Sequence, residues 1–201
     1  MQKLVIATGN QGKLHELQTL LSDLSVELIT QKSLGISDAD ETGLTFVENA
    51  LIKARHAAAI SGLPALADDS GLCVDVMNGG PGIYSARYAG AGAKDSTNND
   101  KLLSDLLPFR AQGVIKAQFV CVLVFLRHAH DPLPMICQGI WHGEILAERR
   151  GSHGFGYDPL FWLPELGCSS AELEPTLKNQ ISHRGQAMAQ LKAALTTLAQ
   201  G

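Results

Sequence analysis

A glycine-bearing loop near the start of the chain has the residue types that hold a phosphate group. The stretch TGNQGK, residues 8–13, follows the apolar run LVIA and precedes a helical pattern. Gly9 and Gly12 allow a sharp turn and a close approach to an anion, and a helix N-terminus offers free N–H groups. Thr8 and Asn10 add donors, and Lys13 adds a positive charge. The loop predicts phosphate binding. It matches neither common phosphate motif, so a plain strand-to-helix turn with a solvated lysine stays open.

A second lysine lies on a helix that the sequence predicts with a defined start. Thr45 and Glu48 have the T-x-x-E spacing of a capping box, and an alanine-rich run follows. Asn49, Lys53 and His56 then share one helix face. Either that face is solvated, or Lys53 points toward the same phosphates as Lys13.

Acidic residues occur in two segments that suit a divalent cation. ADDSG, residues 67–71, joins two apolar strand candidates, and the loop SDADETG carries Asp40 and Glu41. Because side chains alternate along a strand, we expect Asp68 and Asp69 to point to opposite faces. One carboxylate from each segment would suit Mg²⁺, which takes few protein ligands. A turn motif and a solvated loop are the alternatives.

Two loops near the C-terminus have residues suited to a nucleobase. In GFGYDP, Phe155 could stack on a base and Asp158 could accept a hydrogen bond from a ring N–H. In ISHRG, His183 and Arg184 fall in a first helical turn, where the helix dipole disfavours cations. Lys178 is nearby in the sequence. A core position for Phe155 and surface exposure for the basic pair are the simpler explanations.

The elements that must position these residues alternate between strand and helix. This order predicts an α/β protein whose mixed sheet also contains an antiparallel hairpin. The expected strands are 4–7, 26–30, 64–68, 71–77, 117–126 and 135–146, with a short strand in DPLFWLP; the expected helices are 13–22, 45–60, 98–107 and 182–198.

The composition favours one globular domain, residues 1–201. The chain is 45% hydrophobic and 18% charged, and its formal net charge of −4 argues against nucleic acid as a partner. No apolar run reaches the length of a membrane span. The chain enters a strand pattern without a signal peptide, so we expect a cytoplasmic protein. The four cysteines lack the spacing of a zinc site.

Six motifs in order resemble the inosine triphosphate pyrophosphatase family: TGNQGK, ETGLTFVENALIKA, ADDSGL, PGIYSARYAG, GFGYDPLF and SHRGQA. The resemblance runs from about Lys3 to Leu195. It implies a two-lobed α/β fold, with a long central mixed β-sheet flanked by helices, and a homodimer. It also implies Mg²⁺-dependent hydrolysis of ITP, dITP and XTP between the α and β phosphates. The products would be a monophosphate and pyrophosphate, which keeps deaminated purines out of DNA and RNA.

The resemblance also implies roles for individual residues. Asp69 would be the catalytic proton acceptor and a metal ligand. The run D-E-T-G stands where the family usually has E-E-T-G, so the second ligand is Asp40 or Glu41. The residues expected to bind the phosphates are Thr8, Gly9, Asn10, Gln11, Gly12, Lys13 and Lys53, and those expected to contact the substrate elsewhere are Ser70, Phe155, Gly156, Tyr157, Asp158, Lys178, His183 and Arg184.

Two other functions would use a similar pocket. A related Maf-like pyrophosphatase would act on other bases, but the purine-side motifs GFGYDP and SHRG oppose it. A non-catalytic nucleotide sensor would not need acidic residues in both segments.

Overall fold

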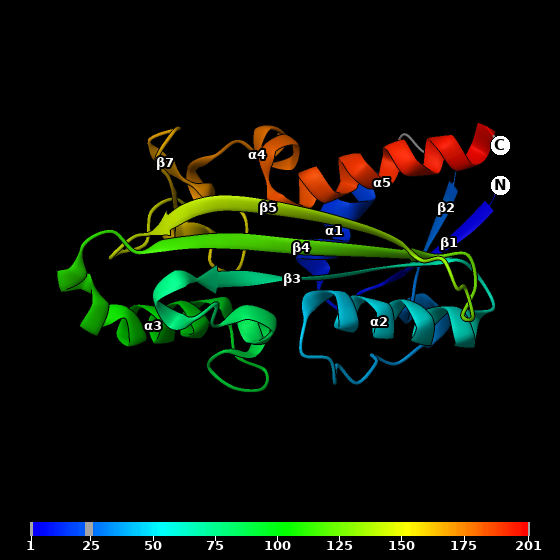
Figure 1. Cartoon of the computed structure of the whole chain (residues 1–201), viewed down its shortest axis with the longest axis horizontal. Helices are drawn as coiled ribbons and strands as arrows, with labels where there is room; N and C mark the ends of the chain where they lie inside the picture. The colour runs from blue at the N-terminus through cyan, green and yellow to red at the C-terminus, as the bar shows by residue number, and fades with distance from the viewer. Residues whose placement is uncertain (1, 23–25, 201) are drawn as a thin grey trace. The chain divides into compact units, whose positions relative to one another are not determined.

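The computed structural model describes residues 2–22 and 26–200, except for the side chains of Gln2, Gln11 and residues 197–200. Strands and helices alternate along the first half of the chain (Figure 1). The strands are β1 (Gln2–Ala7), β2 (Val26–Thr30), β3 (Ala65–Val74), β4 (Lys116–Leu126), β5 (Met135–Ile145), β6 (Phe161–Leu163) and β7 (Cys168–Ser169). The helices are α1 (Gln11–Leu20), α2 (Phe46–Ser61), α3 (Asp95–Leu106), α4 (Pro175–Ile181) and α5 (His183–Gln200).

The strands form a mixed sheet in the order β2-β1-β3-β4-β5-β6-β7. β1 pairs in parallel with β2 and with β3, and the register places Val5 beside Ile29 and Ala65. β5–β6 and β6–β7 are antiparallel pairs. The predicted fold class, an α/β fold with a mixed sheet flanked by helices, is confirmed.

The chain divides into two compact units, and β3, β4 and β5 contribute residues to both. The first unit comprises residues 1–69, 121–139 and 184–201, and the second comprises residues 70–120 and 140–183. Each has its own buried apolar cluster. The first cluster centres on Leu17, Leu66 and Leu123, and the second on Leu102 and Phe161.

In the first unit, helices cover both faces of the strands (Figure 1). Leu17 of α1 and Met188 of α5 share the buried cluster of one face. α2 covers the other face through small residues, among them the fully buried Ala50, Ala54 and Ala57. A narrow alanine surface lets this helix pack closely against the strands.

Local signals place the ends of α2. The Thr45 side chain accepts a hydrogen bond from the Glu48 N–H over 3.3 Å, and Glu48 accepts from the Leu44 N–H over 2.9 Å. Gly62 ends the helix in the left-handed conformation, with φ of 69°. The predicted start and end of this helix are therefore confirmed.

Several predicted boundaries differ from the structure, most clearly at α1, β3 and α3. α1 begins at Gln11, not at Lys13, because Asn10 caps it, so Gly12 lies inside the first turn. Residues 65–74 form a single strand, β3, where two strands were expected. α3 begins at Asp95, three residues before the predicted Asn98, because exposed polar residues fill its first turn and hide the apolar period.

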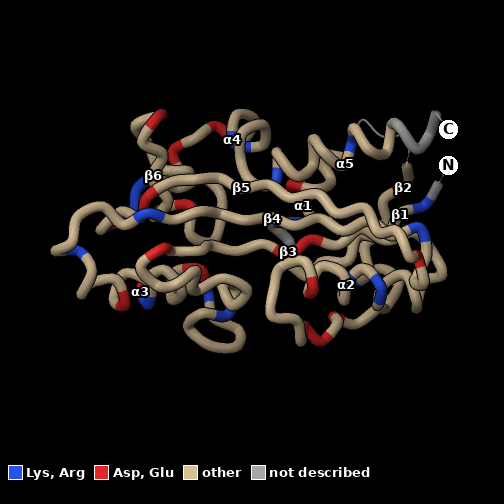
Figure 2. Tube along the Cα trace, viewed as in Figure 1, with Lys and Arg blue, Asp and Glu red and all other residues tan. Residues whose placement is uncertain are grey.

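Charged residues of both signs are interspersed along the described part of the chain (Figure 2). Within that part, no helix is long and apolar enough to cross a membrane.

Candidate active site

One ammonium group joins two carboxylates from separate segments of the first unit. Lys53 Nζ on α2 lies 2.7 Å from Asp69 Oδ1 on β3 and 2.9 Å from Glu41 Oε1 in the preceding loop. The Lys53 side chain is 14% exposed and the Asp69 side chain 8%. The structure thus brings Lys53, Asp69 and Glu41 together, whereas Asp40 is exposed.

The neighbouring aspartate pairs with cations from other elements. Asp68 Oδ2 lies 3.0 Å from Lys13 Nζ of α1 and 3.8 Å from Arg184 Nη2 of α5. Arg184 also forms an ion pair with Glu16. Asp69 pairs with α2, which covers one face of β3, and Asp68 pairs with α1 and α5, which cover the other face (Figure 1). The two aspartates therefore point to opposite faces. This confirms the expectation from strand alternation.

The two aspartates differ in acidity. Burial alone would raise the pKa of Asp68, but Lys13, Arg184 and Lys53 hold that pKa well below its ordinary value. Burial raises the pKa of Asp69 above its ordinary value, although Lys53 and Lys13 oppose the shift. For Lys53, burial would lower the pKa, but Asp68, Asp69 and Glu41 raise it overall. Asp68 is therefore a fixed anion, and Asp69 is the better proton acceptor of the two.

The Glu41–Asp69 pair fits a hard divalent cation. Asp69 Oδ2 is buried and accepts no hydrogen bond from any described residue. The Lys53 ammonium forms ion pairs with both carboxylates, so the two side chains together already bind one positive charge. Among the described residues, no three His, Cys, Asp or Glu side chains form a metal-binding group. Two carboxylates would suit Mg²⁺, which completes its coordination with water and phosphate oxygens.

The opening loop has the expected turn at the N-terminus of α1. The Asn10 side chain accepts a hydrogen bond from the Lys13 N–H over 3.0 Å, and the Asn10 N–H donates to Thr8 Oγ1 over 3.3 Å. A Cβ on Gly9 would lie 3.0 Å from both carboxylate oxygens of Asp38, so this position leaves little room for a side chain. Gln11 begins the helix, and its side chain lies outside those that the structure describes.

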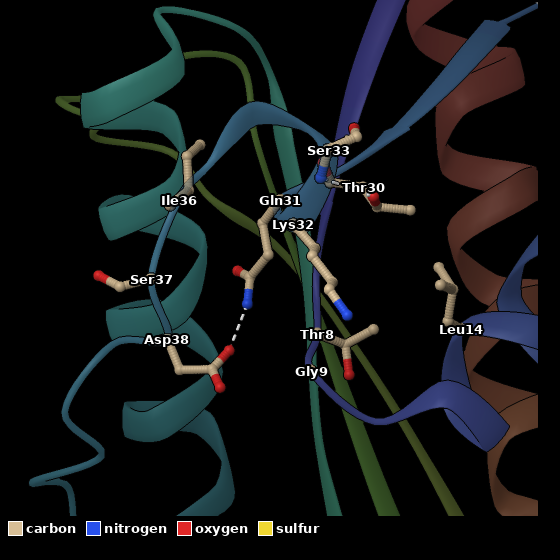
Figure 3. A pocket seen from close by; sticks show the side chains of 10 residues that line it. All are labelled: Thr8, Gly9, Leu14, Thr30, Gln31, Lys32, Ser33, Ile36, Ser37 and Asp38. Atoms are coloured by element: carbon tan, nitrogen blue, oxygen red, sulfur yellow. Dashed lines mark hydrogen bonds between the residues drawn. The ribbon is translucent and has the colours of Figure 1, made fainter.

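A cavity of about 790 Å³ opens beside this loop in the first unit (Figure 3). Thr8 and Gly9 form part of its wall, and the Lys32 side chain extends from the end of β2 toward them. A hydrogen bond from Gln31 to Asp38 lines the other side. The cavity is large enough for a chain of phosphates.

In the second unit, Asp158 organises the glycine-rich loop. Its Oδ2 accepts hydrogen bonds from the Phe155 N–H over 2.8 Å and from Lys178 Nζ over 2.6 Å, and its Oδ1 accepts from Ser170 Oγ over 2.9 Å. Asp158 is 2% exposed and Lys178 6%. The Lys178 ammonium lies 5.3 Å from the centre of the Phe155 ring. Both oxygens of Asp158 therefore hold the loop together, and Phe155 remains only partly buried.

Tyr157 and His183 anchor this loop region in the core of the second unit. The Tyr157 hydroxyl donates to the Ser85 carbonyl over 2.8 Å. The His183 ring stacks on Phe119 with centroids 4.8 Å apart. His183 and Arg184 are both buried, so the alternative that the basic pair is simply surface-exposed is wrong. Ser70 directly follows Asp69 in β3.

Sequence reasoning missed several partners of the predicted residues, among them Glu16 and Asn49. Glu16 pairs with Arg184, but as one acid on a helix it carries no distinguishing signal. Asn49 accepts a hydrogen bond from the Gly43 N–H over 2.9 Å and thereby holds the loop that carries Glu41. The shared face of Asn49 and Lys53 was the available signal for Asn49.

Comparison with known proteins agrees along almost the whole chain. A model of the Ham1 family matches residues 4–194. The chain is 62% identical to a dITP/XTP pyrophosphatase of Acinetobacter baumannii over 195 residues, covering 96% of this chain and 94% of that protein. It is 55% identical to a dITP/XTP pyrophosphatase of Vibrio cholerae, covering 97% of each.

Solved structures agree with these sequence matches. A HAM1 protein from Coxiella burnetii is similar with a TM-score of 0.91 and 49% identity, covering 98% of this chain and 100% of that one. The Ham1 protein of Staphylococcus aureus has a TM-score of 0.85 and 40% identity, covering 98% and 99%. On these matches, this chain belongs to the Ham1 family.

Proposed function

We propose that this protein hydrolyses noncanonical purine nucleoside triphosphates, namely dITP, ITP and XTP. The bond cleaved lies between the α and β phosphates, and the products are the nucleoside monophosphate and pyrophosphate. The chain is a hydrolase of triphosphate anhydride bonds, like the dITP/XTP pyrophosphatases that it resembles at 55–62% identity. The observation that carries the proposal is the Asp69–Lys53–Glu41 group, in the same unit as the loop from Thr8 to Lys13.

Phosphate binding is assigned to residues of the first unit. The residues are Thr8, Gly9, Asn10, Gln11, Gly12, Lys13 and Lys53. The backbone of the loop and the free N–H groups of α1 suit an anion. Lys13 and Lys53 are already held by Asp68 and Asp69, so each ammonium is fixed in place before a substrate arrives. Such preorganised charge stabilises the transition state of phosphoryl transfer.

Asp69 is assigned to the attacking water. Its buried Oδ2 has no donor among the described residues, so it is available to accept a proton from water. Asp69 and Glu41 would hold Mg²⁺, and the geometry favours Glu41 over Asp40 as the second ligand. Mg²⁺ bound there would neutralise charge on the phosphates and on the departing pyrophosphate.

Base recognition is assigned to Phe155, Gly156, Tyr157, Asp158 and Lys178, with Ser70, His183 and Arg184. Phe155 would stack on the purine, and Asp158 keeps that loop folded. The 6-oxo group of inosine and xanthine accepts a hydrogen bond, whereas the 6-amino group of adenine donates one. An N–H of Arg184 or of the main chain that binds the 6-oxo group would meet a second donor, the 6-amino group, in ATP, which disfavours ATP strongly.

The setting of the reaction is part of the proposal. Residues 1–201 act as one pyrophosphatase domain, the enzyme is a cytoplasmic homodimer, and its role is to clear deaminated purines from the nucleotide pool. The near-complete coverage of the relatives in both directions supports a single functional domain.

The test measures pyrophosphate and inorganic phosphate separately. Purified protein is incubated with dITP, XTP, dGTP, dATP and dTTP, in Mg²⁺ and in EDTA. Pyrophosphate released from dITP and XTP alone, and only with Mg²⁺, is expected. Inorganic phosphate as the product would move the attack to the γ phosphate and overturn the mechanism. Turnover of pyrimidine nucleotides instead would favour a Maf-like enzyme, and binding without turnover a sensor.

A further inference from the structure

α3 holds both backbone groups of one glycine in the loop of residues 154–158. The Gly156 N–H donates to Asp95 Oδ2 over 2.6 Å, and the Gly156 carbonyl accepts from Asn99 Nδ2 over 3.0 Å. Asp95 and Asn99 are four residues apart, so they lie on the same face of the helix. All three residues belong to the second unit. The helix thus fixes the peptide groups on each side of Gly156.

A buried asparagine inside a helix, as at position 99, stabilises the fold less than an aliphatic residue would. It is 3% exposed, and asparagine is a weak helix former. Its Oδ1 is buried and accepts no hydrogen bond from any described residue. A buried acceptor without a donor costs free energy, so an aliphatic residue of similar size would stabilise the core better. What asparagine adds here is the hydrogen bond to Gly156.

Gly156 is a position where the backbone needs such support. Its φ of 63° is left-handed, and it separates Phe155 from Tyr157. Asp158 holds the Phe155 N–H, and Ser85 holds the Tyr157 hydroxyl. With Asp95 and Asn99 added, the backbone on each side of Phe155 is bound. The residues that hold Gly156 therefore help to fix the backbone that carries the Phe155 ring.

We infer that Asp95 and Asn99 are positioning residues that place the Phe155 ring for stacking on the purine and so determine affinity for the base end of the nucleotide. This inference rests on the proposed function, which assigns Phe155 to the base. Neither residue needs to touch the substrate, because both act through Gly156. A displaced ring loses stacking, while the residues assigned to the phosphates belong to the other unit.

The test separates the base end from the phosphate end. Binding of IMP is measured by calorimetry, and pyrophosphate is measured as an inhibitor of dITP turnover. The variants are Asn99→Leu, which removes the donor and the unpaired acceptor, and Asp95→Ala, which removes the acceptor. Asp95→Asn keeps an oxygen for the Gly156 N–H and is the conservative rescue. Asp100→Asn is the matched control, since Asp100 lies on the same helix but pairs with Arg149 at the surface.

Asn99→Leu and Asp95→Ala are expected to weaken IMP binding about fivefold to tenfold, the factor expected from one lost hydrogen bond. The inhibition constant of pyrophosphate and the Tm should stay close to wild type, and Asp95→Asn and Asp100→Asn should bind IMP nearly normally. Unchanged IMP affinity in both disruptive variants would overturn the inference. So would equal weakening of IMP and pyrophosphate with a lowered Tm, because that marks a general structural role. A wild-type protein that releases no pyrophosphate from dITP would instead contradict the proposed function.

Discussion

The Lys53 ammonium donates to the Asp69 carboxylate over 2.7 Å while also pairing with Glu41 over 2.9 Å. A residue of α2 thereby joins the middle of β3 to the loop that precedes α2. A metal ion bound by these two carboxylates would either lie beside the Lys53 ammonium or displace it.

Asp69→Asn should reduce pyrophosphate release from dITP by about 10²–10⁴-fold, the contribution of a general base. The amide keeps the shape of the side chain but cannot take a proton from water. Activity and Tm are measured together, and the Tm should fall only modestly, because Lys53 keeps its ion pair with Glu41. Full activity in the variant would show that Asp69 is not the proton acceptor.

Glu41→Gln should raise the Mg²⁺ concentration needed for half-maximal activity by about 10–100-fold, the range seen when the surroundings of a bound metal are perturbed. Asp40→Asn is the matched control one residue away, and it should change this requirement little because Asp40 is exposed. A metal titration of dITP turnover makes the comparison. The reverse order of effects would assign the second ligand to Asp40.

Lys53→Met should lower the free energy of unfolding by about 1–3 kcal/mol in EDTA. The loss is smaller than that for a fully buried pair because the lysine is partly exposed. Without the ammonium, Asp69 and Glu41 face each other with no cation between them. Added Mg²⁺ should restore part of the stability, as denaturant unfolding with and without the metal would reveal. Equal stability of the variant in both conditions would argue against a metal at this pair.

Gly154→Ala should disrupt the loop that holds Phe155. Gly154 has a φ of 77°, and a Cβ there would overlap a carboxylate oxygen of Asp158. Gly167→Ala is the control for backbone strain alone, since Gly167 has a φ of 65° with no atom near its Cβ position. The control should cost about 1–2 kcal/mol of stability. Gly154→Ala should cost more and should also weaken IMP binding, which the control should leave unchanged.

Protonation of Asp131 should make the protein less stable in acid. Its carboxylate accepts hydrogen bonds from the Arg127 side chain and from the Leu133 N–H, and the Arg127 bonds hold the Asp131 pKa well below its ordinary value of 3.8. Because the folded pKa is lowered, the stabilisation is fully present above the unfolded value of 3.8 and is lost as the pH falls below it. Asp131→Asn should therefore lower stability at pH 7, and the difference from wild type should shrink below about pH 4. A difference that stays constant from pH 7 to pH 3 would contradict this assignment.

Some features of this protein were decided by local sequence. The turn at residues 8–13, the start of α2 at Thr45 and the opposite directions of Asp68 and Asp69 all depend on residues within a few positions of one another. Capping, glycine conformation and strand alternation are short-range effects, so the sequence predicts them directly. Six motifs in order were also enough to indicate the family.

Other features required the tertiary structure. Which acid of the D-E-T-G run meets Asp69 depends on where Lys53 of α2 reaches across to β3. The burial of Arg184 depends on Glu16, which is 168 residues away in the sequence. The support of Gly156 by Asp95 and Asn99 joins segments about 60 residues apart, and the helix that carries them starts without an apolar pattern. Long-range pairs of this kind are set by packing of whole elements, and no local propensity encodes them.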